Sequence, residues 1–87
     1  MVSRTLKVEN AVGLHARPAT YFIQKANSYY STIAIECDGG KVNAKSLLGV
    51  LSLGIHQGSE ITLTATGSDE NEAIAGLVAL IEAGFSE

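Results

Sequence analysis

Residues 61–66 constrain the fold most strongly, because apolar and threonine side chains alternate along them. The segment is ITLTAT, so Ile61, Leu63 and Ala65 would point to one face of an extended strand while three threonines point to the other. Such a strand belongs in a sheet that has one face covered by apolar packing and one face in water. The sequence therefore predicts a two-layer structure.

Three further strands are predicted from the same period of two. Apolar and polar residues alternate over about residues 4–9 and again over residues 33–37. The Asp-Gly-Gly at residues 38–40 offers the positive φ values of a tight hairpin, which leads into a short strand at residues 41–43. These last two strands should pair antiparallel.

Three segments have the features of helices. Residues 16–28 carry apolar side chains at helical spacing, with Pro18 in the first turn, where its missing N–H costs nothing. Ser46 stands as the N-cap of a short apolar run that ends at a glycine. Asp69 and Glu72 have the spacing of a capping box ahead of the last helix.

The predicted order is β-α-β-β-α-β-α, an α+β fold in which helices cover one face of a four-stranded sheet. Residues 1–87 are long enough for one hydrophobic core and too short for two, so we expect a single domain. Periodicity alone leaves the order of the strands open.

Charge and hydropathy argue against two classes of partner. The net charge is −3 and the six basic residues are scattered along the chain, which argues against direct binding to nucleic acid. No apolar run approaches the roughly 18 residues that would cross a bilayer, and no apolar signal-peptide core is present. We therefore expect a cytoplasmic protein without membrane insertion.

The cysteine and the two histidines do not suggest a metal site. Cys37 is the single cysteine and lies in a strand-like run, where a buried structural thiol is expected. His15, His56 and Cys37 lack the spacing of a zinc site, so we expect no metal and no cofactor.

His15 and Arg17 stand at the start of the first predicted helix. The unpaired N–H groups and the dipole of a helix N-terminus favour an anion such as phosphate. A neutral imidazole can attack a phosphoryl group, and a guanidinium can hold its oxygens in a bidentate manner. Gly13 lets the chain turn into such a site. From the residues alone, an alternative stays open: His15 and Arg17 could be ordinary surface residues at an exposed helix start, without a role in binding or catalysis.

The short second helix carries leucines around most of its circumference, at 47, 48, 51 and 53. One sheet cannot bury them all, so either an exposed apolar patch or covering loops must account for them. Ser46 has an ordinary capping role there. A phosphate on it would be compatible with the helix dipole and would add roughly −1.5 to −2 charges beside the leucines.

Two segments resemble the HPr family, the histidine-containing phosphocarrier proteins of the bacterial phosphoenolpyruvate-dependent sugar phosphotransferase system. NAVGLHARPAT at residues 10–20 is similar to the family's active-site segment, and KSLLGVLSLGI at residues 45–55 is similar to its regulatory-serine segment. The resemblance covers nearly the whole chain. It implies an open-faced β-sandwich with strand order 1-4-2-3 and three helices on one face.

The resemblance also implies a function that is not enzymatic. His15 would accept a phosphoryl group on Nδ1 from phosphorylated enzyme I and pass it to the IIA units of sugar permeases, while Arg17 steadies the group. Partners would dock around the histidine and the second helix. The positions implied for helix-start support and for docking are Gly13, Ala16, Pro18, Thr20, Leu47, Leu48, Gly49, Leu51 and Ser52.

Ser46 matches the position that HPr kinase/phosphorylase phosphorylates in some bacteria, where the phosphoserine form slows sugar uptake and serves as corepressor for the catabolite control transcription factor. An alternative function is therefore an HPr-like regulator of carbon catabolite repression that acts by binding through Ser46. A stand-alone hydrolase lacks the other groups of its site. A monomer is expected, because the predicted sheet needs no second copy.

Two positions fall outside the family pattern. Val12 stands where the family commonly has a small polar residue, so support of the active-site turn would differ here. His56 lies beside Gln57 and Gly58 in a predicted turn and is interpreted as a solvated loop residue, not as a second phosphoryl site.

Overall fold

The computed structural model describes residues 1–11, 13–14 and 16–85. Within these residues, strands and helices follow the predicted order β-α-β-β-α-β-α. The elements are β1 (Val2–Lys7), α1 (Ala16–Asn27), β2 (Thr32–Cys37), β3 (Gly40–Asn43), α2 (Leu47–Ser52), β4 (Glu60–Thr66) and α3 (Glu70–Glu82).

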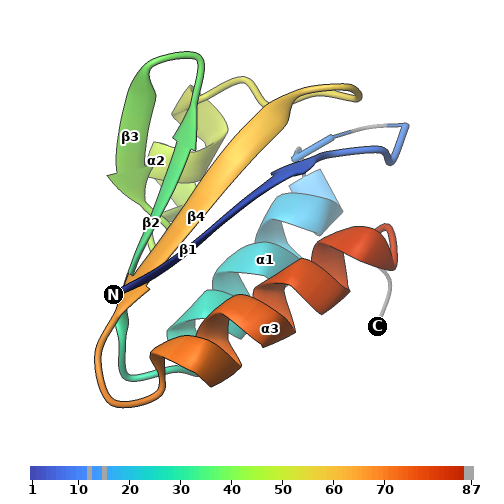
Figure 1. Cartoon of the computed structure of the whole chain (residues 1–87). Helices are drawn as coiled ribbons and strands as arrows, with labels where there is room; N and C mark the ends of the chain where they lie inside the picture. The colour runs from blue at the N-terminus through green and yellow to red at the C-terminus, as the bar shows by residue number, and fades with distance from the viewer. Residues whose placement is uncertain (12, 15, 86–87) are drawn as a thin grey trace.

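The strands form one antiparallel sheet in the order β1-β4-β2-β3. This confirms the predicted α+β fold class and the strand order 1-4-2-3. In Figure 1, α1 and α3 lie side by side against one face of the sheet, and α2 lies behind the β2–β3 hairpin. The helices therefore form a single layer and leave the other face of the sheet open.

The two faces of β4 differ as the alternation predicts. Its apolar residues Ile61, Leu63 and Ala65 have no exposed surface. On the outer face, Thr62 pairs with a threonine of β1 through hydroxyls 2.9 Å apart, and Thr64 pairs with Ser3 through hydroxyls 3.1 Å apart. Cross-strand hydroxyl pairs of this kind add to the stability of an antiparallel sheet.

The core lies between the sheet and the helices. Phe22 of α1, Ile35 of β2 and Leu77 of α3 are fully buried in it. Cys37 is a free thiol and is buried, as expected, and burial is the main cause that raises its pKa. A thiol of this kind behaves as a small apolar side chain.

β1 begins two residues earlier than predicted. Val2 is half-buried against the core and lies opposite Ala65 of β4, so the ladder starts there. Its other end leaves regular pairing after Lys7, although Val8 is still fully buried and its N–H donates to the Ser59 carbonyl over 2.8 Å. The observed strand, Val2–Lys7, therefore begins and ends two residues before the predicted span of 4–9. The alternating pattern misplaced the end because it continues past Lys7, the last regular strand residue.

The predicted capping box of Asp69 and Glu72 is wrong. Asp69 makes no side-chain cap bond to α3. Its carboxylate instead accepts hydrogen bonds from the N–H of Tyr30 at 2.8 Å, from the N–H of Ser31 at 2.9 Å and from the Ser31 hydroxyl. Ser31 is only 1% exposed, so its polar groups need a protein partner. Glu70 accepts from the Gly67 N–H at the same helix start.

These contacts predict an acid-dependent part of the stability. The Ser31 hydroxyl, followed by the Tyr30 N–H, holds the pKa of Asp69 below its usual value. A carboxyl with a lowered pKa in the folded state stabilises the fold fully above its unfolded pKa of about 4, and this stabilisation is lost as the pH falls through the folded value. Asp69→Asn should therefore lower the free energy of unfolding at pH 7 and weaken its dependence on pH below about 4.

Urea unfolding of both proteins at a series of pH values measures this effect. Glu72→Gln is the matched control, because Glu72 is an exposed carboxyl on the same helix. Equal changes of slope in the two variants would contradict the prediction.

Candidate functional site

The predicted acceptor His15 and the neighbouring Val12 lie outside the described residues, but the residues that hold the turn between them are described. Leu14 is 1% exposed, and its N–H donates to the Ile55 carbonyl over 3.1 Å. Gly13 is buried with φ +63°. A Cβ at Gly13 would lie 2.5 Å from the Ile55 oxygen and 2.6 Å from the His56 Cα. Only glycine fits this turn without displacement.

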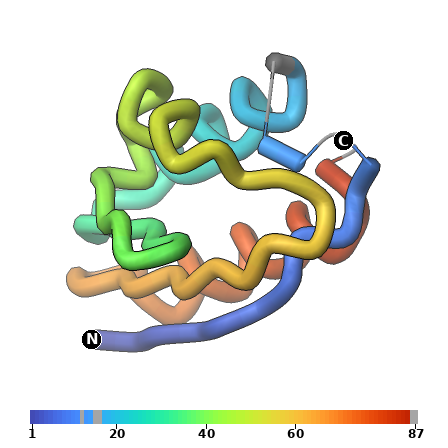
Figure 2. Tube along the Cα trace, turned by 90° about the horizontal axis from the view of Figure 1, so that it is seen from above, coloured from blue at the N-terminus to red at the C-terminus, as the bar shows by residue number. Residues whose placement is uncertain are grey.

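The loop between α2 and β4, residues 53–59, forms the support for this turn, and we call it the platform loop. Figure 2 shows it running alongside the segment that leads from β1 into α1. The Gly58 N–H donates to the Val8 carbonyl at 2.7 Å, and the Gln57 side chain donates to the Glu9 carbonyl at 3.1 Å. The platform loop is thus hydrogen-bonded directly to the segment that follows β1.

Asn10 closes the turn from the other side. Its side-chain amide donates to the Gly13 carbonyl at 2.9 Å, and its own carbonyl accepts from the Gly13 N–H at 3.2 Å. Neither Asn10 nor the platform loop was identified from the sequence as support for the turn. The asparagine before the glycine was a usable signal, since asparagine commonly bonds to nearby backbone in turns.

α1 begins at Ala16, immediately after the predicted acceptor. Pro18 is half-buried in the first turn, whereas Arg17 and Thr20 are exposed. No acidic residue stands in the first turn. The start of α1 therefore presents an exposed guanidinium without a competing carboxylate in the same turn, a suitable environment for an anion.

Ser46 is the N-cap of α2, as predicted. Its hydroxyl oxygen accepts from the Gly49 N–H over 3.1 Å, and the Ser52 hydroxyl donates to the Gly49 carbonyl over 2.6 Å. The segment before Ser46 is anchored to the end of α1, because the Lys45 ammonium donates to the Tyr29 carbonyl at 2.7 Å. Ser46 thus occupies a fixed position next to α1.

Leucines of α2 form an exposed apolar patch. Leu48 is 82% exposed, Leu47 43% and Leu51 37%, and we call these three residues the α2 patch. Val50, on the opposite side of the helix, is fully buried. The alternative that loops cover the leucines is therefore wrong for these three. Since α2 packs against α1, the patch belongs to the same side of the molecule as the helix layer.

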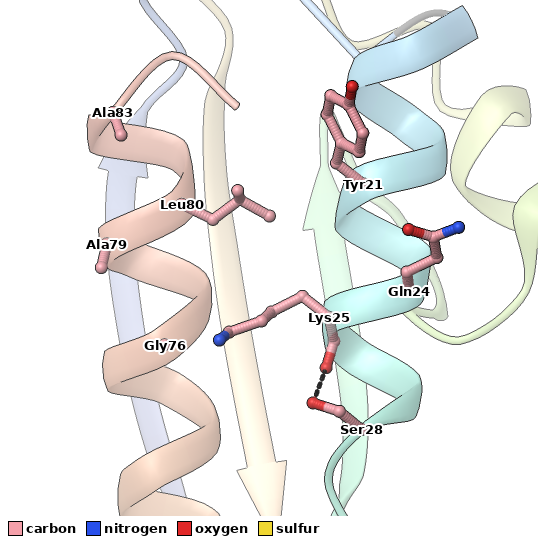
Figure 3. Close-up of a pocket in the computed structure, with 8 residues that line it drawn as sticks. All are labelled: Tyr21, Gln24, Lys25, Ser28, Gly76, Ala79, Leu80 and Ala83. Atoms are coloured by element: carbon pink, nitrogen blue, oxygen red, sulfur yellow. Dashed lines mark hydrogen bonds between the residues drawn. The ribbon is translucent and has the colours of Figure 1, made fainter. Parts of the chain in front are cut away.

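A groove of about 600 Å³ between α1 and α3 lies apart from these residues. Figure 3 shows Tyr21 and Lys25 of α1 facing Gly76 and Leu80 of α3, with the Lys25 side chain reaching across towards α3. None of the predicted site residues lines it. The candidate site is consequently the turn at the start of α1 together with Ser46 and the α2 patch.

No helix among the described residues has the length and apolar character required to cross a membrane.

Comparisons with known proteins agree on one family. The model of the PTS HPr component phosphorylation site matches residues 2–83. A curated relative, the HPr-like protein Crh of Halalkalibacterium halodurans, is 52% identical over 82 residues, which are 94% of this chain and 98% of the relative. A crystal structure of HPr-C-His from Thermoanaerobacter tengcongensis is 50% identical with a TM-score of 0.97, covering 100% of this chain and 98% of the other.

The same organism supplies a structure described as an HPr dimer. It is 50% identical to this chain, covers all of both chains and has a TM-score of 0.80. The HPr-C-His structure supports the fold of a single copy. The structure described as a dimer raises the question whether copies of this chain associate.

Proposed function

The chain belongs to the PTS HPr family, and we propose that within it this protein is a phosphoryl carrier whose acceptor is His15. The observation that carries the proposal is the imidazole at position 15, directly after a turn that Gly13 and Leu14 fix against the platform loop. A fixed approach to the helix start lowers the entropy lost when a donor protein positions its phosphoryl group.

The proposed chemistry needs few residues of the carrier. The neutral imidazole attacks phosphorus, the bond from phosphorus to the donor breaks, and the imidazole N–H proton leaves to solvent. Arg17, exposed in the first turn of α1, holds the phosphoryl oxygens. In this proposal the protein is a substrate of other enzymes and not itself a catalyst. Phosphorylated enzyme I is the donor, and the IIA units of sugar permeases are the acceptors.

A second candidate function is a regulator that acts by binding through Ser46. The curated relative favours it, because that protein is named an HPr-like protein Crh and not a phosphocarrier. Ser46 caps a helix that bears the exposed α2 patch. A phosphate on Ser46, added by a kinase of the HPr kinase/phosphorylase type, would change the charge beside the patch without removing a core contact. A catabolite control transcription factor is the partner proposed for that form.

One experiment separates the two functions. The full chain is incubated with enzyme I and labelled phosphoenolpyruvate, and in parallel with HPr kinase and labelled ATP. Acid-labile label from the first reaction supports the carrier, because phosphohistidine is hydrolysed in acid. Acid-stable label from the second reaction alone, with enzyme I shown to phosphorylate a reference HPr, would replace the carrier with the regulator.

The α2 patch predicts a docking defect. Leu48→Ser removes the most exposed leucine, so we expect the KM for enzyme I to rise on the order of tenfold, as for a residue at the centre of a small interface. The melting temperature should change little, because the side chain is 82% exposed.

Glu72→Ser is the control for this variant, as an exposed position on a helix outside the patch. An unchanged KM in Leu48→Ser would contradict the role of the patch. We propose that the protein is a monomer, in contrast to the Thermoanaerobacter protein whose structure is described as a dimer. Size-exclusion chromatography of the same proteins tests this oligomeric state.

A further inference from the structure

The groove between α1 and α3 has no part in the proposed function. Its volume of about 600 Å³ falls within the range of protein sites that hold a small molecule. Figure 3 shows that its two walls come from different helices and differ in chemistry. The α1 wall carries polar and charged side chains, whereas the α3 wall consists of alanine, leucine and glycine residues. The groove therefore suits a ligand that is itself part polar and part apolar.

Gly76 allows the Lys25 side chain to lie across the groove. A Cβ at Gly76 would stand 3.1 Å from the Lys25 Cε and would overlap the Tyr29 hydroxyl. The end of the lysine side chain therefore reaches α3, as Figure 3 shows. The Lys25 ammonium also lies 5.9 Å from the centre of the Tyr29 ring, and this cation–π contact favours the same position.

The positive charge of Lys25 has no acidic partner in the part of the chain that the structure describes. The ion pairs found there are Met1–Glu70 and Arg4–Glu82, and no hydrogen bond engages the Lys25 ammonium. An ammonium has three N–H donors, so all three are available to a ligand. Among the described residues that line the groove, Lys25 is the one charged group. The groove thus offers a single positive charge.

The end of the groove beyond Lys25 suits an apolar ring. Tyr21 stands one turn before Lys25 on α1, about 6 Å along the helix axis, and is half-buried. Leu80 of α3 is also half-buried, and its side chain points towards α1 (Figure 3). An aromatic ring between these two residues would stack on the tyrosine and pack against the leucine.

We propose that the groove binds a small aromatic monocarboxylate, with the carboxylate on Lys25 and the ring between Tyr21 and Leu80. One negative charge matches the single lysine. The second negative charge of a phosphate ester would meet no cation in the lining, and the net charge of −3 would repel it. The site is independent of the carrier and regulator functions, because none of the described residues assigned to them lines the groove.

The test is an NMR titration of the isotope-labelled full chain with phenylpropionate. We expect saturable shifts of the amide signals of Tyr21, Lys25 and Leu80, with a dissociation constant on the order of 1 mM, as for a ligand of this size. Phenylpropanamide keeps the ring and lacks the charge. It should bind roughly twofold to fivefold more weakly, the usual contribution of an exposed charge pair.

Two pairs of variants locate the site. Ala79→Leu fills the groove from an exposed position of α3 and should abolish saturable binding, whereas Ala75→Leu, exposed on the same helix outside the groove, should bind as the wild type does. Lys25→Gln should weaken phenylpropionate roughly twofold to fivefold and leave phenylpropanamide unchanged. Lys41→Gln removes an equal charge from β3 and should change neither affinity.

Three results would overturn the proposal. Shifts that grow linearly with phenylpropionate would mean that the groove is not a site. Undiminished binding in Ala79→Leu would place the ligand elsewhere on the protein. Equal affinities for phenylpropionate and phenylpropanamide would mean that Lys25 does not hold the carboxylate. Thermal melts of Ala79→Leu and Ala75→Leu show whether both variants are folded, and Lys25→Gln tests the site without any change of volume in the α3 wall.

Discussion

Substituting His15 by alanine should abolish acid-labile phosphorylation by enzyme I while leaving the fold intact. The reaction needs a nucleophilic nitrogen, and alanine offers none. The contacts that hold the turn come from Leu14, which is buried and bonded to Ile55, and from Gly13 against the platform loop. Both remain in the variant. We therefore expect complete loss of label with a melting temperature within about 2–4 °C of the wild type.

Radiolabel counting and a thermal melt on the same samples check this result. Ser46→Ala is the companion variant, since it should keep the acid-labile label and lose the label from HPr kinase. Residual acid-labile phosphate in His15→Ala would place the acceptor elsewhere, and His56 would be the residue to examine next.

The largest loss of stability is expected from Gly13→Ala. Alanine at φ +63° is strained, and its Cβ would overlap the Ile55 oxygen and the His56 Cα at 2.5 and 2.6 Å. Both neighbours are backbone atoms, so neither can move aside as a flexible side chain would. Strain and overlap together should lower the free energy of unfolding by about 2–4 kcal/mol. The melting temperature should then fall by roughly 10–25 °C.

Gly54→Ala separates the two causes. Gly54 has the same φ of +63°, but a Cβ there meets no atom within 4 Å. The free energy of unfolding of Gly54→Ala should fall only by the cost of the backbone conformation, about 1 kcal/mol. Equal losses in the two variants, measured by urea unfolding, would mean that the contact with the platform loop contributes nothing.

Local patterns predicted the fold well where the responsible contacts are themselves local. The alternation in residues 61–66 gave the two faces of β4, and Ser46 caps α2 through Gly49, three residues away. The strand order came from the family resemblance, because periodicity does not specify which strands are neighbours.

Contacts between residues that are far apart in the chain could not be predicted from local sequence patterns. Aspartate is a residue type typical of helix N-caps, yet the Asp69 carboxylate accepts hydrogen bonds from Tyr30 and Ser31. The fold brings these two residues to it from 38 or more positions away in the sequence. Gly13 was recognised as a turn residue, but its contact with Ile55 and His56 follows only from the arrangement of the platform loop. For the site, the sequence indicated Ser46 and an exposed patch on α2, and the structure places both beside α1. His15 stays a prediction from the residues and the family.

The position of β4 in the sheet has a consequence for synthesis on the ribosome. β4 lies between β1 and β2 and pairs with both, whereas β1 and β2 do not pair with each other. Until residues 60–66 have emerged, the nascent chain can form the β2–β3 hairpin, but β1 has no partner strand. β1, the first of these strands to be made, must therefore wait for β4, and this long loop closure delays completion of the sheet until residues 60–66 have been made.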